Sequence, residues 1–113
     1  MIDQIQPAQL PDWIAAHAAD GHTVVLDVRE PWEIQTACVT AQGFELVKMV
    51  MHTIPARLNE LDRDRPIACL CHHGARSMQV AAFLAQQGFA HVANIAGGID
   101  AWSAQVDATV PMY

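Results

Sequence analysis

Residues 66–77 read Pro66-Ile67-Ala68-Cys69-Leu70-Cys71-His72-His73-Gly74-Ala75-Arg76-Ser77. The run 66–71 is continuously apolar, a pattern typical of a strand that is buried on both faces. A short loop containing Gly74 follows, and residues 77–87 then distribute apolar side chains around a helix that ends at Gly88. The chain therefore passes from a buried strand through a tight loop into a helix, which is the local order of a parallel α/β sheet.

The same alternation of apolar runs and helical patterns extends along the rest of the chain. Strands are predicted at 23–28, 44–51, 66–71 and 91–95, and helices at 7–19, 30–33, 53–61, 77–87 and 97–102. Strands that alternate with helices imply right-handed crossovers and a mainly parallel sheet. Ligands of such sheets bind beyond the carboxyl ends of the strands, and Cys71 lies at one of these ends.

Composition limits the classes of protein to which the chain can belong. Its 113 residues fit one domain, 1–113, and with 52% hydrophobic and 16% charged residues we expect a packed core. The formal net charge is −6 and the basic residues are scattered, which argues against a nucleic-acid partner and against a basic membrane anchor. Neither a signal peptide nor an apolar run of membrane-spanning length is visible, so the expected location is cytoplasmic.

Cys71 stands apart from the other two cysteines because of the loop that follows it. Cys38 and Cys69 are expected to be small hydrophobic residues of the core. After Cys71, Gly74 permits a turn whose backbone N–H groups can converge on an anion, and the next helix directs its positive end to the same place. This arrangement stabilises a thiolate and predicts that Cys71 is a nucleophile. A purely structural cysteine is the alternative, but it does not account for the glycine and arginine that follow.

The remaining loop residues have predicted supporting roles. His72 and His73 are expected at the mouth of the loop, either as exposed residues or as contacts to the substrate. Ala75 lies within the loop, and Arg76 offers a planar guanidinium that suits an oxyanion or the carbonyls of the loop. Ser77 is expected to cap the following helix, with donation of a hydrogen bond to the sulfur as the alternative.

A metal site is the other reading of this region, because cysteines and histidines cluster within it. Zinc sites normally draw their ligands from two separated pairs. The histidines outside the loop form no second spaced pair along the sequence; these histidines are His17, His22, His52 and His91. We therefore expect no metal and no other cofactor.

Three motifs of the chain resemble those of one known family. Val25 to Glu33 resembles the "LDVREPxE" segment of rhodanese-like domains, Cys71 to Ser77 is similar to their Cys-x-x-Gly-x-Arg-Ser motif, and Gly97 to Trp102 is similar to their terminal "GGxxxW" element. The motifs occur in the family's order, and the resemblance covers roughly residues 3–105. The segment 37–44 departs from the family pattern, since the usual histidine and glycine after Glu33 are absent.

The resemblance implies a rhodanese-like α/β fold, with a mainly parallel five-stranded sheet and helices on both faces. It also implies a sulfurtransferase of the thiosulfate type. Cys71 would take the outer sulfur of a donor such as thiosulfate, and the resulting persulfide would pass it to cyanide or a thiol; the donor or acceptor can also be a protein. In the family the first motif helps to brace the site, so Asp27 and Arg29 are expected to form a buried or cleft ion pair there; a purely structural role for the two residues is the preferred alternative.

Loop length separates this prediction from a related one. Cys71 and Arg76 are separated by four residues, whereas the phosphatases that resemble this fold have one residue more, because phosphate is larger than a sulfur atom. The spacing therefore favours sulfur transfer over phosphatase or arsenate reductase activity. A non-catalytic rhodanese-like binding or regulatory module is the alternative function, although inactive members typically lack the cysteine that this chain retains.

Overall fold

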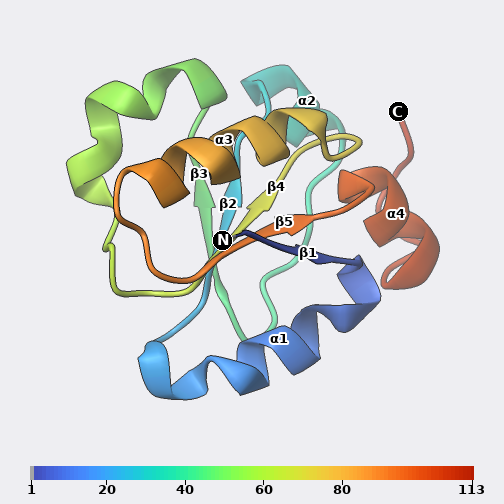
Figure 1. The fold of residues 1–113 in the computed structure, drawn as a ribbon. Helices are drawn as coiled ribbons and strands as arrows, with labels where there is room; N and C mark the ends of the chain where they lie inside the picture. Colours follow the sequence, from blue (N-terminus) through green and yellow to red (C-terminus); the bar gives the residue numbers. More distant parts are fainter. Residues whose placement is uncertain (1) are drawn as a thin grey trace.

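The computed structural model describes residues 2–113 and contains a five-stranded sheet (Figure 1). The strands are β1 (Ile2–Ile5), β2 (Val24–Asp27), β3 (Glu45–Lys48), β4 (Ile67–Leu70) and β5 (Val92–Ile95), in the spatial order β1-β5-β4-β2-β3. Every neighbouring pair is parallel, so the predicted parallel α/β architecture is confirmed. β4 lies at the centre of the sheet, and the loop that begins with Cys71 leaves from its carboxyl end.

Helices cover both faces of the sheet, as predicted. They are α1 (Leu10–Ala16), α2 (Pro31–Thr36), α3 (Ala75–Gln86) and α4 (Gly98–Gln105), with the short 3-10 helices η1 (Pro7–Gln9), η2 (Ala18–Asp20), η3 (Met51–Thr53) and η4 (Pro55–Glu60). In Figure 1, α1 and α4 lie on one side of the strands and α2 and α3 on the other. None of the helices within residues 2–113 combines the length and the apolar character that a membrane crossing requires.

The central strand shows why its sequence is continuously apolar. Ala68 and Leu70 pack into the cluster on the α1 and α4 face, with side chains such as Trp102. Ile67 and Cys69 pack into the opposite cluster, which includes Leu84 of α3 and Leu61. Because both faces of β4 are covered, its residues do not alternate between polar and apolar. Packing on both faces also fixes the position of the carboxyl end of the strand.

The structure differs from the sequence prediction at the N-terminal edge and in two helices. β1 was absent from the predicted strands, because it is a short edge strand in which Asp3 and Gln4 are exposed. The predicted helix 7–19 is divided into η1, α1 and η2, since Pro11 lacks the N–H that would join the first turns into one α-helix. Residues 53–61 form 3-10 turns instead of the predicted α-helix, with Pro55 at the start of η4.

Candidate active site

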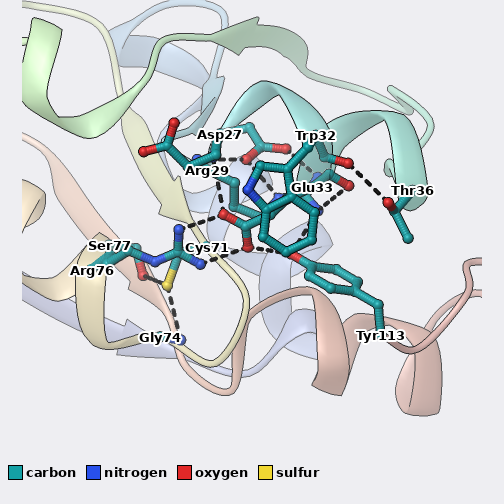
Figure 2. Close-up of polar contacts among 11 residues, drawn as sticks. Asp27, Arg29, Trp32, Glu33, Thr36, Cys71, Gly74, Arg76, Ser77 and Tyr113 are labelled. Carbon is teal, nitrogen blue, oxygen red and sulfur yellow. Dashed lines mark hydrogen bonds and ion pairs between the residues drawn. The ribbon is translucent and has the colours of Figure 1, made fainter.

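Cys71 is the first residue after β4, and its side chain is only 1% exposed. The backbone N–H of Gly74 donates a hydrogen bond to Cys71 Sγ at 3.0 Å (Figure 2). Gly74 also caps the N-terminus of α3 with φ of 104°, a conformation that glycine adopts without strain. The turn therefore directs a backbone donor and the positive end of a 12-residue helix toward the sulfur, as the strand–loop–helix pattern predicts.

The opposite side of the loop is held by the N-terminus of α4. The backbone N–H of Ile99 donates to the carbonyl of Cys71 at 2.8 Å, and that of Asp100 donates to the carbonyl of His72 at 3.2 Å. Gly98 makes this approach possible, because a Cβ placed there would lie 2.4 Å from both carbonyl oxygens. The double glycine of the third motif thus serves to seat α4 against the loop.

Ser77 lies inside α3 and does not cap it, contrary to the preferred prediction. The helix begins at Ala75, one to two residues earlier than expected, so the Ser77 side chain faces the buried interior. Its hydroxyl donates to Asn94 Oδ1 at 2.5 Å and lies 3.3 Å from Cys71 Sγ. The amide of Asn94 in turn donates to Gln4 and to the Gly74 carbonyl, which fixes Oδ1 as an acceptor.

This network determines what Ser77 can offer to the sulfur. A hydroxyl carries one hydrogen, and that of Ser77 is directed at Asn94. Ser77 therefore accepts a hydrogen bond from the Cys71 thiol, and it can donate to a thiolate only by turning away from Asn94. In this arrangement the Gly74 N–H is the donor that favours the ionised sulfur.

Arg76 forms a bidentate ion pair with Glu33 of α2. Its two terminal nitrogens lie 2.6 Å and 2.8 Å from the two carboxylate oxygens of Glu33 (Figure 2). The sequence predicted contact with an oxyanion or with the carbonyls of the loop, whereas the structure uses this guanidinium to join α3 to α2. The Arg76 hydrogen bonds hold the pKa of Glu33 down at about 2, against an ordinary value of 4.5.

The depressed pKa of Glu33 predicts an acid-dependent stability. Because the carboxylate is favoured in the folded state, its stabilising effect is complete above about pH 4.5 and is lost as the pH falls toward 2. We expect Glu33→Gln to lower the free energy of unfolding near neutral pH by about 2 kcal/mol, a value that already includes a reduction for the partial exposure of Arg76. The loss of stability should become progressively smaller as the pH falls. Urea denaturation of both proteins at several pH values measures this difference.

Glu60→Gln is the matched control, since Glu60 forms a similar pair with Arg57 on the exposed surface. It should change stability little at any pH, because water screens an exposed pair. A Glu33→Gln penalty that stays constant from neutral pH to pH 2 would contradict the assigned role of the Glu33 charge.

Asp27 and Arg29 form the ion pair that the resemblance implies. Arg29 Nε and Nη2 lie 2.8 Å and 2.7 Å from the two carboxylate oxygens of Asp27, and both side chains are fully buried. Arg29 also donates to the backbone carbonyl of Glu33 at 3.3 Å and to the hydroxyl of Tyr113 at 3.1 Å. The pair therefore fixes the start of α2, and with it the carboxylate that binds Arg76.

Tyr113 packs against the loop that follows Cys71. Its hydroxyl donates to Glu33 Oε2 at 2.7 Å, and its ring stacks on His72 with the centroids 3.9 Å apart. His72 stacks in turn on His73, also at 3.9 Å, while Trp32 meets Tyr113 edge-on at 6.0 Å. Burial, assisted by the bond to Glu33, raises the pKa of Tyr113 to about 12, so the phenol remains a donor.

The two histidines of the loop differ in environment. Burial, with the neighbouring His73, lowers the pKa of His72 and thereby favours its neutral form. His73 is largely exposed, with its Nδ1 3.8 Å from Asp100. The structure thus places His73 at the surface of the loop, as one of the two predicted alternatives, and His72 within an aromatic stack.

Cys69 lies in the core as predicted, whereas Cys38, also predicted to be a core residue, is only partly buried. Cys69 is fully buried in the core, and burial raises the pKa of its thiol to about 12. Cys38 is partly exposed and lies outside the loop region. Within residues 2–113, the side chains around Cys71 form no group of three with the geometry of a metal site.

Sequence reasoning missed four residues of this region. Glu33 was visible within the first motif, but only the structure shows that it binds Arg76. Asn94 is a lone polar side chain in the buried strand β5, which is a signal for a specific hydrogen-bonding role. Gly98 belongs to the third motif, but the sequence does not show that it contacts the Cys71 loop. No sequence pattern marks Tyr113, because its contacts depend on the path of the C-terminal segment.

Comparisons with known proteins agree with the fold and the motifs. The model of the rhodanese-like domain family matches residues 10–105. A protein of Allochromatium vinosum named Sulfurtransferase is 39% identical over 106 residues, which cover 91% of this chain and 90% of that protein. A rhodanese-like/PpiC domain-containing protein of Arabidopsis thaliana is 41% identical over 91 residues, but these cover 79% of this chain and only 30% of the Arabidopsis protein.

The solved structures include a rhodanese-related protein of Thermoplasma volcanium with 28% identity and a TM-score of 0.75, covering 98% of this chain and 99% of that one. The relative named as a sulfurtransferase supports a sulfurtransferase role for this chain. With a family model that spans most of its residues and a fold shared along its length, the chain belongs to the rhodanese-like domain family.

Proposed function

We propose that the chain, acting as one domain, is a thiosulfate-type sulfurtransferase that carries sulfur as a persulfide on Cys71. The observation that supports this most directly is the hydrogen bond of 3.0 Å from the Gly74 N–H to Cys71 Sγ, at the N-terminus of α3. A backbone donor at the positive end of a helix stabilises a thiolate, and it also stabilises the negative charge of a persulfide.

The proposed reaction consists of two displacements at sulfur. In the first, the Cys71 thiolate attacks the outer sulfur of thiosulfate, the sulfur–sulfur bond of the donor breaks, and sulfite leaves with the bonding electron pair. In the second, cyanide or a thiolate attacks the terminal sulfur of the Cys71 persulfide and restores the thiolate. The two steps balance without an external oxidant or reductant, and division of the transfer into two displacements is the advantage of covalent catalysis.

The charges around the loop bear on which donor suits it. Arg76 is neutralised by Glu33, and the lowered pKa of His72 reduces its positive charge near neutral pH. The loop therefore presents less positive charge to doubly charged thiosulfate than its sequence suggests. We expect modest thiosulfate turnover, with a persulfide on a small thiol or a protein as the better donor.

A non-catalytic binding module is the second candidate, and the burial of Cys71 is the observation that favours it. At 1% exposure the sulfur meets a donor only after a side chain or part of the loop moves. The intact hydrogen bond to the sulfur favours catalysis, because a module that only binds partners has no need of a stabilised thiolate.

Intact mass measurement separates the two functions. Incubation of the reduced protein with thiosulfate should add one sulfur atom, and cyanide should remove it with release of thiocyanate. Peptide mapping should place the adduct in the peptide that contains Cys71. A protein that remains unmodified by thiosulfate and by a small-molecule persulfide would support the binding module, and Cys71-dependent hydrolysis of p-nitrophenyl phosphate would support a phosphatase.

A further inference from the structure

His17, Asp20 and His91 form a cluster that the proposed sulfur chemistry does not use. His17 is the C-terminal cap of α1, Asp20 belongs to η2, and His91 lies immediately before β5. Spacing along the sequence revealed no such group, because 70 residues separate Asp20 from His91 and only the folded chain brings them together.

The three side chains have the separations of metal ligands. His17 Nδ1 lies 3.1 Å from one carboxylate oxygen of Asp20, and His91 Nε2 lies 3.5 Å from the other. One candidate ligand atom from each residue falls within 4.8 Å of the other two. Ligands about 2.0–2.1 Å from a tetrahedral zinc ion are about 3.3 Å from one another. A small rotation of the imidazoles would bring the three ligand atoms to that separation.

The backbone around each ligand is already fixed. The N–H of Asp20 donates to the His17 carbonyl at 2.9 Å, and the His91 carbonyl accepts from Ile67 of β4 at 2.9 Å. The His17 ring packs on Trp13 with the centroids 4.5 Å apart, and the Trp13 indole donates to Asp3 at 2.9 Å. Binding an ion would therefore require little ordering of the chain, which lowers the cost of association.

Hydrogen bonding of two imidazoles to one carboxylate is the simpler explanation of these contacts, and it accounts for each pair separately. Because both imidazoles reach the same carboxylate, the His17 and His91 rings lie only 5.1 Å apart at their centroids, and all three side chains face one place. The three side chains are also only partly exposed, at 21% to 36%, which leaves one side open for a further ligand.

We propose that His17, Asp20 and His91 bind one Zn²⁺ ion, with a fourth position left to water. Two imidazoles and a carboxylate are donors that suit zinc. Figure 1 places η2 and the start of β5 at the end of the sheet opposite the β4–α3 loop. Five residue steps along the direction of β4, about 16 Å, separate the level of His91 from that of Cys71, so the ion ties the α1–η2 segment to the sheet and takes no part in sulfur transfer.

Zinc titration of a Cys38→Ser/Cys71→Ser protein tests this site, because these substitutions remove the partly exposed thiol of Cys38 and the loop thiol of Cys71, both of which could also bind zinc. Calorimetry should show one ion per chain, and a hundredfold excess of free Zn²⁺ over Kd should raise Tm by roughly 10 °C. Mg²⁺ should have no effect, since it prefers oxygen ligands. Co²⁺ should give the visible absorption of a four-coordinate site.

His17→Gln and His91→Gln in the same background should each weaken zinc binding at least about 100-fold and abolish the Tm shift. His52→Gln, which removes a histidine of η3, is the matched control and should bind as the parent does. Absence of stoichiometric binding in the parent would overturn the proposal. So would zinc binding that survives both His17→Gln and His91→Gln, because the ion would then be held elsewhere.

Discussion

Cys71→Ser is expected to abolish sulfur transfer, with a fall in turnover of at least ~10⁴-fold. A serine hydroxyl stays protonated near neutral pH, and a persulfide cannot form on oxygen. The substitution is nearly isosteric and retains the Gly74 and Ser77 hydrogen bonds, so the fold should be preserved. Thiocyanate production from thiosulfate and cyanide measures the loss, and circular dichroism verifies the fold.

Cys38→Ser is the control for a general effect of losing a thiol. Cys38 is partly exposed and its thiol donates to the carbonyl of the adjacent Val39, so turnover should remain close to that of the parent protein. Cys69→Ser is less suitable, because it places a hydroxyl in the fully buried core and would destabilise the protein. Retention of turnover in Cys71→Ser together with its loss in Cys38→Ser would assign the nucleophile to Cys38.

Gly98→Ala is expected to damage stability and activity together. The added Cβ would meet the carbonyl oxygens of Cys71 and His72 at 2.4 Å, a distance at which the backbone of the loop or of α4 has to move. Such a clash between backbone segments should cost roughly 3 kcal/mol or more, beyond the cost of φ of 60° in alanine. Movement of Cys71 would then misplace the sulfur relative to the Gly74 N–H and slow persulfide formation.

Gly88→Ala separates the clash from the backbone strain. Gly88 has φ of 90°, but a Cβ there would have no neighbour within 4 Å. This variant should lose only about 1–2 kcal/mol in denaturant unfolding and should keep its sulfur-transfer rate. Equal losses in the two variants would show that the contact between α4 and the loop is unimportant for the site.

The sequence predicted the centre of the sheet better than its edges. Strands buried on both faces, such as β4, have continuous apolar runs that need no knowledge of the rest of the molecule. β1 lacks this signal, because an edge strand with exposed Asp3 and Gln4 resembles a loop in composition. Proline interrupts the helical patterns near residues 11 and 55, and periodicity alone does not show how the chain accommodates it.

The geometry of the Cys71 loop was predictable where it depends on the local sequence. The order of Cys71, Gly74 and a helix determines the contact between the sulfur and a backbone N–H. The bonds from Arg76 to Glu33 and from Ser77 to Asn94 were not predicted, because each partner lies on a different element: Glu33 on α2 and Asn94 on β5. Such partners follow from tertiary packing, which a single sequence does not specify.

The loop that surrounds the sulfur is held mainly through its main chain. α4 binds the carbonyls of Cys71 and His72, and Asn94 binds that of Gly74, so these contacts are independent of the side chains at positions 72 and 73. Exchange of those two residues would leave these main-chain contacts in place, while it would remove the stacking of His72 on Tyr113. Related proteins could acquire different sulfur donors by drift at two positions, and an engineer could randomise the same pair without rebuilding the scaffold.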